Sequence, residues 1–274
     1  MNRINSRELE PQPFVKSRRV FIMVVIGVYA IPAVIFTLNA LTAFDTSLAW
    51  KYFSVAVAGS SFFCLAMWGL RKERIPLKAI GLTLSGIREA VLLTVGGWAI
   101  VVLVNIFGKI IDHGNVAELL DKSVLYVLLY WIFVGVAEEI LFRGYILTRL
   151  MKTWAARNNV LGKTLAVVVA SFLFATAHIP QRVYQVASGD MTLAEVFGSV
   201  VLLSIVGIAF SYLFLRTKSI ILVGLIHGAV IVPLVGFGED AFLPVIILAT
   251  LYIELFLFLR RIRSRRDLRS TLIS

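Results

Sequence analysis

Two adjacent glutamates, Glu138 and Glu139, lie in a long apolar segment, and Arg143 follows four residues after the second. Ionisable groups at membrane depth are costly unless they are paired or hydrated, which makes them candidates for function. Residues at i and i+4 share a helix face, so Glu139 and Arg143 are predicted to form a structural ion pair. Glu138 is rotated by about 100° from Glu139, and we expect it to face a cavity as a general base. The alternative is a single salt-bridge network of all three residues.

Two of the three histidines also lie in apolar segments. His178 ends an apolar run, with Phe174 four residues earlier on the same predicted helix face. A plainer interpretation of His178 is a side chain that reaches the outer interface. His227 has no polar residue within four positions on either side, so it needs a partner on another helix, for which Glu138 is the natural candidate. His113 is expected in a solvated loop. Together, the carboxylates and imidazoles predict water chemistry inside a membrane.

The composition is that of a membrane protein with several spans. Hydrophobic residues make up 59% of the 274 residues and charged residues only 16%, which excludes an ordinary soluble domain. The net charge of +11 is spread in short clusters between apolar segments, as the positive-inside rule expects. No basic run is interleaved with exposed aromatic residues, so nucleic acid is not expected as a partner.

Apolar segments of about 20 residues are long enough to cross a bilayer as helices. The sequence therefore predicts an all-α polytopic membrane protein whose single transmembrane domain covers residues 1–274. Its eight expected spans are Val20–Phe44, Trp50–Leu70, Glu89–Ile111, Val124–Ile146, Thr164–His178, Val196–Leu215, Ser219–Phe237 and Phe242–Leu259.

The basic residues predict the orientation of these spans. With both termini in the cytoplasm, 23 of the 27 Lys and Arg residues, Arg143 and Arg149 among them, fall on the cytoplasmic side. Only Lys51, Lys109, Lys122 and Arg182 fall elsewhere. A basic cytoplasmic tail is expected over residues 260–274. Short loops favour the plasma (inner) membrane of a prokaryote.

Three motifs resemble one known family. Glu-Glu-x-x-x-Arg at 138–143, Phe-x-x-x-His at 174–178 and a later membrane-embedded histidine, His227, occur in order on separate predicted spans. This pattern resembles the CPBP family of CAAX proteases and bacteriocin-processing enzymes, also called the Abi family, which includes the type II CAAX prenyl endopeptidases. The resemblance covers about residues 120–235, the expected catalytic core.

The resemblance implies an intramembrane endopeptidase that acts on a membrane-associated protein or peptide, either prenylated or carrying a leader. It implies that Glu138 activates the attacking water with His178 beside it, that Glu139 and Arg143 hold the helix, and that His227 helps to bind the oxyanion. As a glutamate protease the enzyme needs no cofactor. A zinc site formed by Glu138, His178 and His227 is the alternative, although the sequence contains no His-Glu-x-x-His motif.

One position departs from the family. Its last motif has Asn or Asp four residues after the histidine, where this chain has Ile231. If that polar group supports the oxyanion, its loss costs about 10²–10³ in rate, unless Asn105, Gln181 or Gln185 replaces it. A catalytically silent binding, immunity or scaffold protein is therefore the main alternative function.

A proton-coupled transporter is a third hypothesis, with Glu254 joining Glu138 and the two histidines in a relay. Glu254 is more simply expected to extend towards Arg260 and Arg261. The predicted spans also raise a question of depth. Counted from their cytoplasmic ends, His178 lies nearer the outside than Glu138, so the two meet only if the helices tilt or a boundary shifts by a turn.

Overall fold

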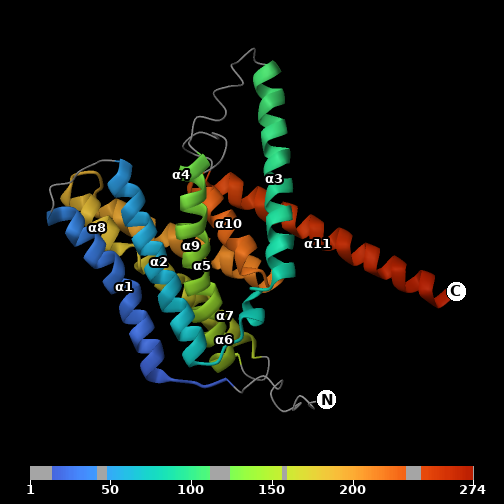
Figure 1. The fold of residues 1–274 in the computed structure, drawn as a ribbon, viewed down its shortest axis with the longest axis horizontal. Helices are drawn as coiled ribbons and strands as arrows, with labels where there is room; N and C mark the ends of the chain where they lie inside the picture. Colours follow the sequence, from blue (N-terminus) through green and yellow to red (C-terminus); the bar gives the residue numbers. More distant parts are fainter. Residues whose placement is uncertain (1–13, 42–47, 112–123, 156–158, 233–241, 274) are drawn as a thin grey trace, which may run out of the picture.

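The computed structural model describes residues 14–41, 48–111, 124–155, 159–232 and 242–273, and all regular elements within these ranges are helical. The all-α prediction is therefore confirmed for the described chain. Figure 1 shows the helices as a bundle from which α3 and α11 extend. In chain order the elements are α1 (Arg18–Leu41), α2 (Leu48–Lys72), η2 (Leu77–Ile80), α3 (Leu84–Ile111), α4 (Val124–Leu129), η4 (Tyr130–Val136), α5 (Ala137–Glu139), η5 (Ile140–Leu147), α6 (Thr148–Trp154), α7 (Val160–Thr176), α8 (Ile179–Ala187), α9 (Leu193–Thr217), α10 (Ile220–Ile231) and α11 (Phe242–Ile273).

Several of these helices are long and apolar enough to cross a membrane, which makes the chain an integral membrane protein. Helix α10 is apolar but shorter, and the number of eight spans stays a prediction. Among the described residues the five candidate spans are Arg18–Leu41, Tyr52–Lys72, Leu77–Val104, Val160–Ala187 and Leu193–Thr217.

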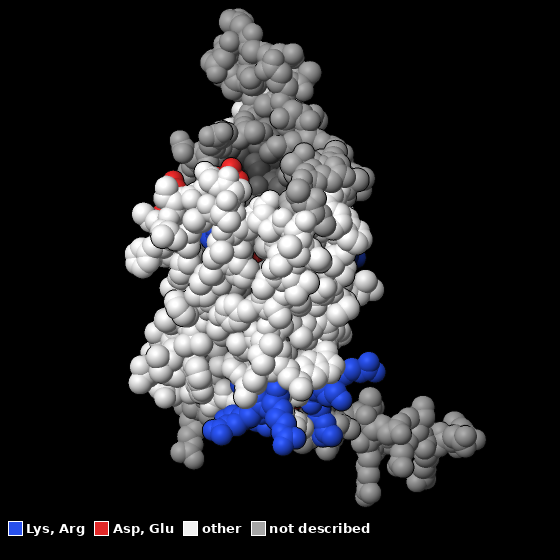
Figure 2. Space-filling model, turned by 90° about the vertical axis from the view of Figure 1, so that its left-hand side faces the viewer, with Lys and Arg blue, Asp and Glu red and all other residues white. Residues whose placement is uncertain are grey.

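Basic side chains gather at one end of the molecule (Figure 2). Arg71 and Lys72 close α2, Lys152 lies in the last turn of α6 and Arg216 in the last turn of α9. These helix ends lie at the end of the bundle where η2 and the start of α3 are found (Figure 1). The positive-inside rule predicts that this end faces the cytoplasm.

The fourth apolar segment is longer than predicted. Its helix does not end at Ile146 but continues through η5 and α6 to Trp154. Arg143 and Arg149, which were counted as cytoplasmic charges, are both buried inside the bundle. Each of these two residues is buried because it pairs with a buried carboxylate. Arg149 pairs with the fully buried Glu73 at 3.0 Å.

The residues after His178 form a helix that was not predicted. Helix α8 follows directly from α7 and has a proline in its first turn. Backbone nitrogens in the first turn have no hydrogen-bond acceptor within the helix, so proline, which lacks an N–H group, is well tolerated there. The next helix, α9, begins with a capping box in which Thr192 and Glu195 exchange hydrogen bonds. Helix α9 ends at Lys218 in the left-handed conformation, and Ser219 caps α10 by accepting from the Leu222 backbone nitrogen.

Glycines bring η4 and α10 into close contact. A Cβ atom on Gly135 would lie 2.2 Å from the carbonyl oxygen of Gly224, and one on Gly228 would lie 2.4 Å from the Cα of Trp131. Small residues allow such close approach of membrane helices, where packing replaces the hydrophobic effect as the main attraction. The Trp131 indole Nε1 donates to the carbonyl oxygen of Val232 at 2.9 Å and joins the same helices. This contact fixes the position of α10 and therefore of His227.

We expect Gly135→Ala to destabilise the protein by about 1–3 kcal/mol, because the added methyl group has to displace the α10 backbone. Thermal unfolding of the purified protein in detergent measures the effect. The matched control is Gly198→Ala in α9, where a Cβ atom meets nothing within 4 Å and a helical alanine is favoured over glycine. Equal unfolding temperatures for the two variants would contradict the close packing of η4 on α10.

Candidate active site

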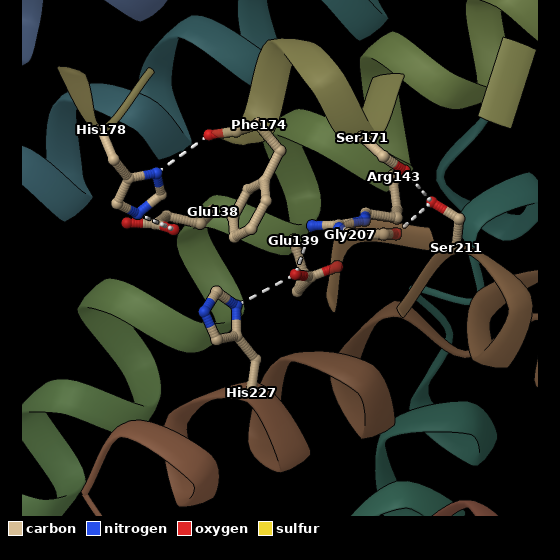
Figure 3. A network of polar contacts seen from close by, with 9 residues as sticks. All are labelled: Glu138, Glu139, Arg143, Ser171, Phe174, His178, Gly207, Ser211 and His227. Atoms are coloured by element: carbon tan, nitrogen blue, oxygen red, sulfur yellow. Dashed lines mark hydrogen bonds and ion pairs between the residues drawn. The ribbon is translucent and has the colours of Figure 1, made fainter. Parts of the chain in front are cut away.

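A cavity of about 540 Å³ lies among the helices and brings together the three residues predicted to do chemistry. Glu138 from α5, His178 at the start of α8 and His227 from α10 all line it. Most of the other lining side chains are apolar and come from α1, α2, η4, α7 and α9. Figure 3 shows the carboxylate of Glu138 close to the ring of His178, with His227 on the other side. The arrangement is a small polar group inside an apolar chamber.

Glu139 and Arg143 form an ion pair behind the cavity. The Arg143 Nη1 atom lies 2.6 Å from Glu139 Oε1, and the two side chains are 1% and 0% exposed. The Nη2 atom of Arg143 donates to the carbonyl oxygen of Gly207 in α9 at 3.0 Å. The predicted pairing of Glu139 with Arg143 is therefore present in the structure, and it links η5 to α9 (Figure 3).

The ring of Phe174 separates this ion pair from the cavity. The Arg143 guanidinium carbon lies 4.5 Å from the centre of the ring, a cation–π geometry. On its other side the Phe174 ring contacts the rings of His178 and His227, whose centres lie 5.0 and 5.7 Å from its own. The backbone carbonyl of Phe174 also contacts His178 Nδ1 at 2.9 Å. Phe174 thus packs against three of the other motif residues, Arg143, His178 and His227.

Glu138 and His178 approach each other without a direct hydrogen bond. The His178 Nε2 atom lies 4.0 Å from Glu138 Oε2, and the side chains are 20% and 12% exposed. Glu138 Oε2 is buried and has no hydrogen-bond partner among the described residues. A carbonyl oxygen only accepts, so His178 Nδ1 carries the proton donated to Phe174. In the neutral ring, Nε2 is then an acceptor that faces Glu138.

The partner of His227 is not the one predicted. Its Nδ1 atom lies 3.0 Å from Glu139 Oε1, so Glu139 and not Glu138 satisfies this buried histidine. The same oxygen also accepts from Arg143. The prediction was wrong because the approach of α10 to α5, which the glycines set, decides which glutamate His227 meets. Glu138 is left free of a strong ion pair.

The question of depth is answered by the helix boundaries. Because the Glu138 helix continues to Trp154, Glu138 lies sixteen residues from that end, which corresponds to about 24 Å of α-helix. Helix α7 begins at Val160, so His178 lies about 27 Å from its own end. The two residues therefore reach similar depths. The helix runs two turns beyond the predicted end at Ile146, because Arg143 and Arg149 lie buried in the bundle and not in a loop.

Ile231 lines the cavity four residues after His227. The family's polar side chain at this position is replaced by an apolar wall. Of the proposed replacements, Gln181 also lines the cavity, whereas Gln185 accepts a hydrogen bond from Arg182 Nη1 at 2.8 Å. The side chain of Asn105 and the whole of His113 lie outside the described residues.

Glu254 does not join the cavity residues. Its carboxylate binds Arg216 through two hydrogen bonds of 2.7 and 2.6 Å and accepts a third from the hydroxyl of Tyr212 at 2.8 Å. The expected extension towards Arg260 and Arg261 was therefore wrong, because α9 supplies a closer arginine. A relay through Glu254 has no continuity with Glu138 in this arrangement.

The side chains do not match a metal site. Within the described ranges, no group of three or more His, Cys, Asp or Glu side chains is arranged to hold a metal ion. The zinc site of Glu138, His178 and His227 does not fit this arrangement.

Sequence reasoning missed the local geometry of the glutamate helix. Glu138 and Glu139 lie on a short α-helical turn, α5, between the π-helical segments η4 and η5. Such widened turns are frequent at functional sites, and no pattern of residues in this segment predicts them. The acceptor at Gly207 was missed because it is a backbone atom. A signal was present in the small residues Ser171, Gly207 and Ser211, which allow α7 and α9 to approach.

Comparison with known proteins supports the resemblance. The family model described as Type II CAAX prenyl endopeptidase Rce1-like matches residues 120–232. A search of curated proteins gives no match. The matched range contains all three motifs and confirms the resemblance to the CAAX protease family that the motifs predicted.

We expect Arg143→Met to destabilise the protein by about 3–5 kcal/mol, because it removes one partner of a buried ion pair and leaves Glu139 without its strongest neighbour. Thermal unfolding in detergent and the yield of folded protein measure the loss. Arg260→Met is the control, since Arg260 pairs with Glu89 at 2.7 Å in an exposed position where such pairs contribute little. A loss at Arg143 no larger than that at Arg260 would show that the buried pair does not hold the bundle.

Proposed function

We propose that this chain, a relative of the type II CAAX prenyl endopeptidases over residues 120–232, is an intramembrane endopeptidase. Its substrate would be a membrane-associated protein or peptide, prenylated or carrying a leader. Glu138 would activate the water that attacks the peptide bond. The observation that carries the proposal is the 4.0 Å gap between Glu138 Oε2 and His178 Nε2 in a cavity of apolar walls.

This gap suits a water molecule. Two polar atoms more than 3.5 Å apart are commonly bridged by water, and Glu138 Oε2 is a buried acceptor without a described partner. Because Nε2 of a neutral His178 is also an acceptor, one water can donate its two protons to the two atoms. Its lone pairs then point away from both and towards a substrate in the cavity. Two protein acceptors orient the nucleophile in this way before the substrate arrives.

The hydrolysis follows from these positions. Glu138 takes a proton from the water as the oxygen bonds to the carbonyl carbon of the substrate, and the carbonyl oxygen becomes an oxyanion. The carbon–nitrogen bond then breaks, and Glu138 returns the proton to the leaving amine. The second proton of the water stays on the new carboxyl group, so the products are a carboxylic acid, which then ionises in water, and an amine, and Glu138 is again ionised. General acid–base catalysis of this kind requires reach to the reacting atoms, which the shared cavity supplies.

His227 is the group we assign to the oxyanion. Its Nδ1 atom donates to the Glu139 carboxylate, since an ionised carboxylate only accepts. This contact leaves Nε2 for the cavity that His227 lines. When the ring is protonated, Nε2 donates a hydrogen bond to the developing oxyanion, and Glu139 stabilises the imidazolium. Donors aimed at such charge in a water-poor site contribute strongly to rate.

A silent binding protein is the second candidate, and Ile231 favours it. An apolar side chain lines the cavity where the family has a polar one, so the oxyanion would lose a donor. Such a protein would keep the fold and hold a partner helix or a lipid tail in the same cavity. Gln181 is the lining residue able to replace the missing donor, because its amide nitrogen can donate.

Glu138→Gln should abolish proteolysis and leave the amount of folded protein unchanged, because an amide of the same shape cannot take a proton. Peptide termini in membranes and medium are compared by mass spectrometry between host cells that express wild type or the variant at matched levels. Glu89→Gln, an exposed glutamate of another ion pair, is the control and should give the wild-type termini. Identical termini in wild type and Glu138→Gln would contradict the proposed protease activity and favour the binding protein.

Ile231→Asn separates the two candidates. If the chain is a protease with a weakened oxyanion site, the new amide should raise kcat by about 10- to 100-fold, short of the full contribution of an oxyanion donor. Turnover of a peptide released by the wild type measures this change. In Gln181→Leu, loss of a replacement donor should lower kcat. A silent binding protein would show no turnover in wild type and would gain it, if at all, only in Ile231→Asn.

A further inference from the structure

Arg182 contributes a positive charge to the wall of the cavity that holds Glu138 and His178. It is the only Lys or Arg among the described residues that line this cavity. Its Nη1 atom donates to Gln185 Oε1 at 2.8 Å, within α8 itself. Its Nε atom is buried and has no hydrogen-bond partner in the described part of the chain. Buried polar atoms are usually paired, so this donor on a cation is available to an acceptor on a ligand.

The position of Arg182 has no other explanation in the structure. It lies away from the basic end of the molecule, so the positive-inside rule does not account for it. It is in the first turn of α8, where the positive end of the helix dipole disfavours a cation. Its described side-chain hydrogen bond is to a residue of its own helix, so it does not tie α8 to a neighbour. No ion pair of Arg182 is found among the described residues.

The distance to the reacting groups is short. The Arg182 backbone nitrogen donates to the carbonyl oxygen of His178 at 3.0 Å, so the two residues are one turn apart and share a helix face. Side chains with this spacing have Cβ atoms about 5–6 Å apart, and an extended peptide advances about 3.3–3.6 Å per residue. A group bound by Arg182 therefore lies within a few residues of a bond attacked beside His178.

We propose that Arg182 is a specificity-determining residue that binds a carboxylate of the peptide, close to the bond that is cut. The inference rests on the proposed function and adds its substrate chemistry. A guanidinium offers several donors in a planar fork that matches a carboxylate, and the free Nε atom is one of them. The carboxylate is either the free C-terminus of the peptide or the side chain of an Asp or Glu.

The test measures binding without cleavage. The Glu138→Gln protein in detergent is titrated with a fluorescein-labelled apolar peptide of about six residues, and fluorescence anisotropy gives Kd. The peptide is used with a free C-terminus, with a C-terminal amide, and as an amide carrying one Glu. We expect a carboxylate to tighten binding roughly 10- to 100-fold over the plain amide, the range of a hydrogen bond to a charged group.

Three variants, each made in the Glu138→Gln protein, test whether Arg182 causes this preference for a carboxylate. Arg182→Gln should bring the ratio of acid to amide affinity close to one, and Arg182→Lys should keep part of the preference for the acid. The control is Arg88→Gln, which changes an exposed arginine outside the cavity and should leave the preference unchanged. Preference for the free terminus alone identifies the C-terminus as the ligand. Preference for the internal Glu identifies a side chain. Arg182→Lys serves as the second variant if Arg182→Gln does not fold.

The inference fails if Arg182→Gln keeps the full preference, if no carboxylate improves binding, or if none of the three peptides binds up to its solubility limit. Cleavage by the protein with Glu138 intact separates this failure from that of the proposed function. Cleavage that needs Glu138 and shows an unchanged acid preference in Arg182→Gln overturns the role of Arg182 alone. Carboxylate-dependent binding through Arg182 without cleavage overturns the protease and keeps the carboxylate site.

Discussion

The buried contact between Arg143 and Glu139 is the interaction on which the site depends. A guanidinium at membrane depth is stable only when its donors are satisfied, and here Glu139 and the Gly207 carbonyl accept from it while Phe174 packs against its face. These contacts connect η5 to α7 and α9. Because Glu139 Oε1 also accepts from His227, the same carboxylate positions α10. One ion pair thus links the glutamate helix to α7, α9 and α10.

The division of labour between the two glutamates follows from this arrangement. Glu139 has a structural role, because its Oε1 atom accepts hydrogen bonds from Arg143 in η5 and from His227 in α10. Glu138, one residue earlier, is turned into the cavity beside His178. Each glutamate keeps one buried oxygen without a partner among the described residues, but only Glu139 is also held by Arg143 and His227. A residue that catalyses proton transfer has to exchange partners during the reaction, so it benefits from not being held. The fold holds the neighbour instead, and the local π-helical geometry around α5 sets the direction in which Glu138 points.

The cavity combines two environments that a hydrolase in a lipid bilayer needs. Its walls are largely apolar, which keeps bulk water away and strengthens interactions between charges. Its carboxylate and its two imidazoles, from Glu138, His178 and His227, lie near one another on one side (Figure 3). Helix α8 adds Arg182 to this side, so that the carboxylate of Glu138 and a cation line one chamber without forming an ion pair among the described residues. The separation leaves each group available to a ligand.

The sequence by itself determined the class of protein, its all-helical fold and the pairing of Glu139 with Arg143, because hydropathy, basic clusters and the i,i+4 spacing act locally. It also identified Glu138, His178 and His227 as candidates, since apolar neighbours make an ionisable residue conspicuous. Contacts between helices were decided only by the tertiary structure. His227 meets Glu139, Glu254 meets Arg216 and Arg149 meets Glu73, each across many residues of chain. Helix rotation and close approach at glycines such as Gly135 select these partners, and neither quantity is encoded in local spacing.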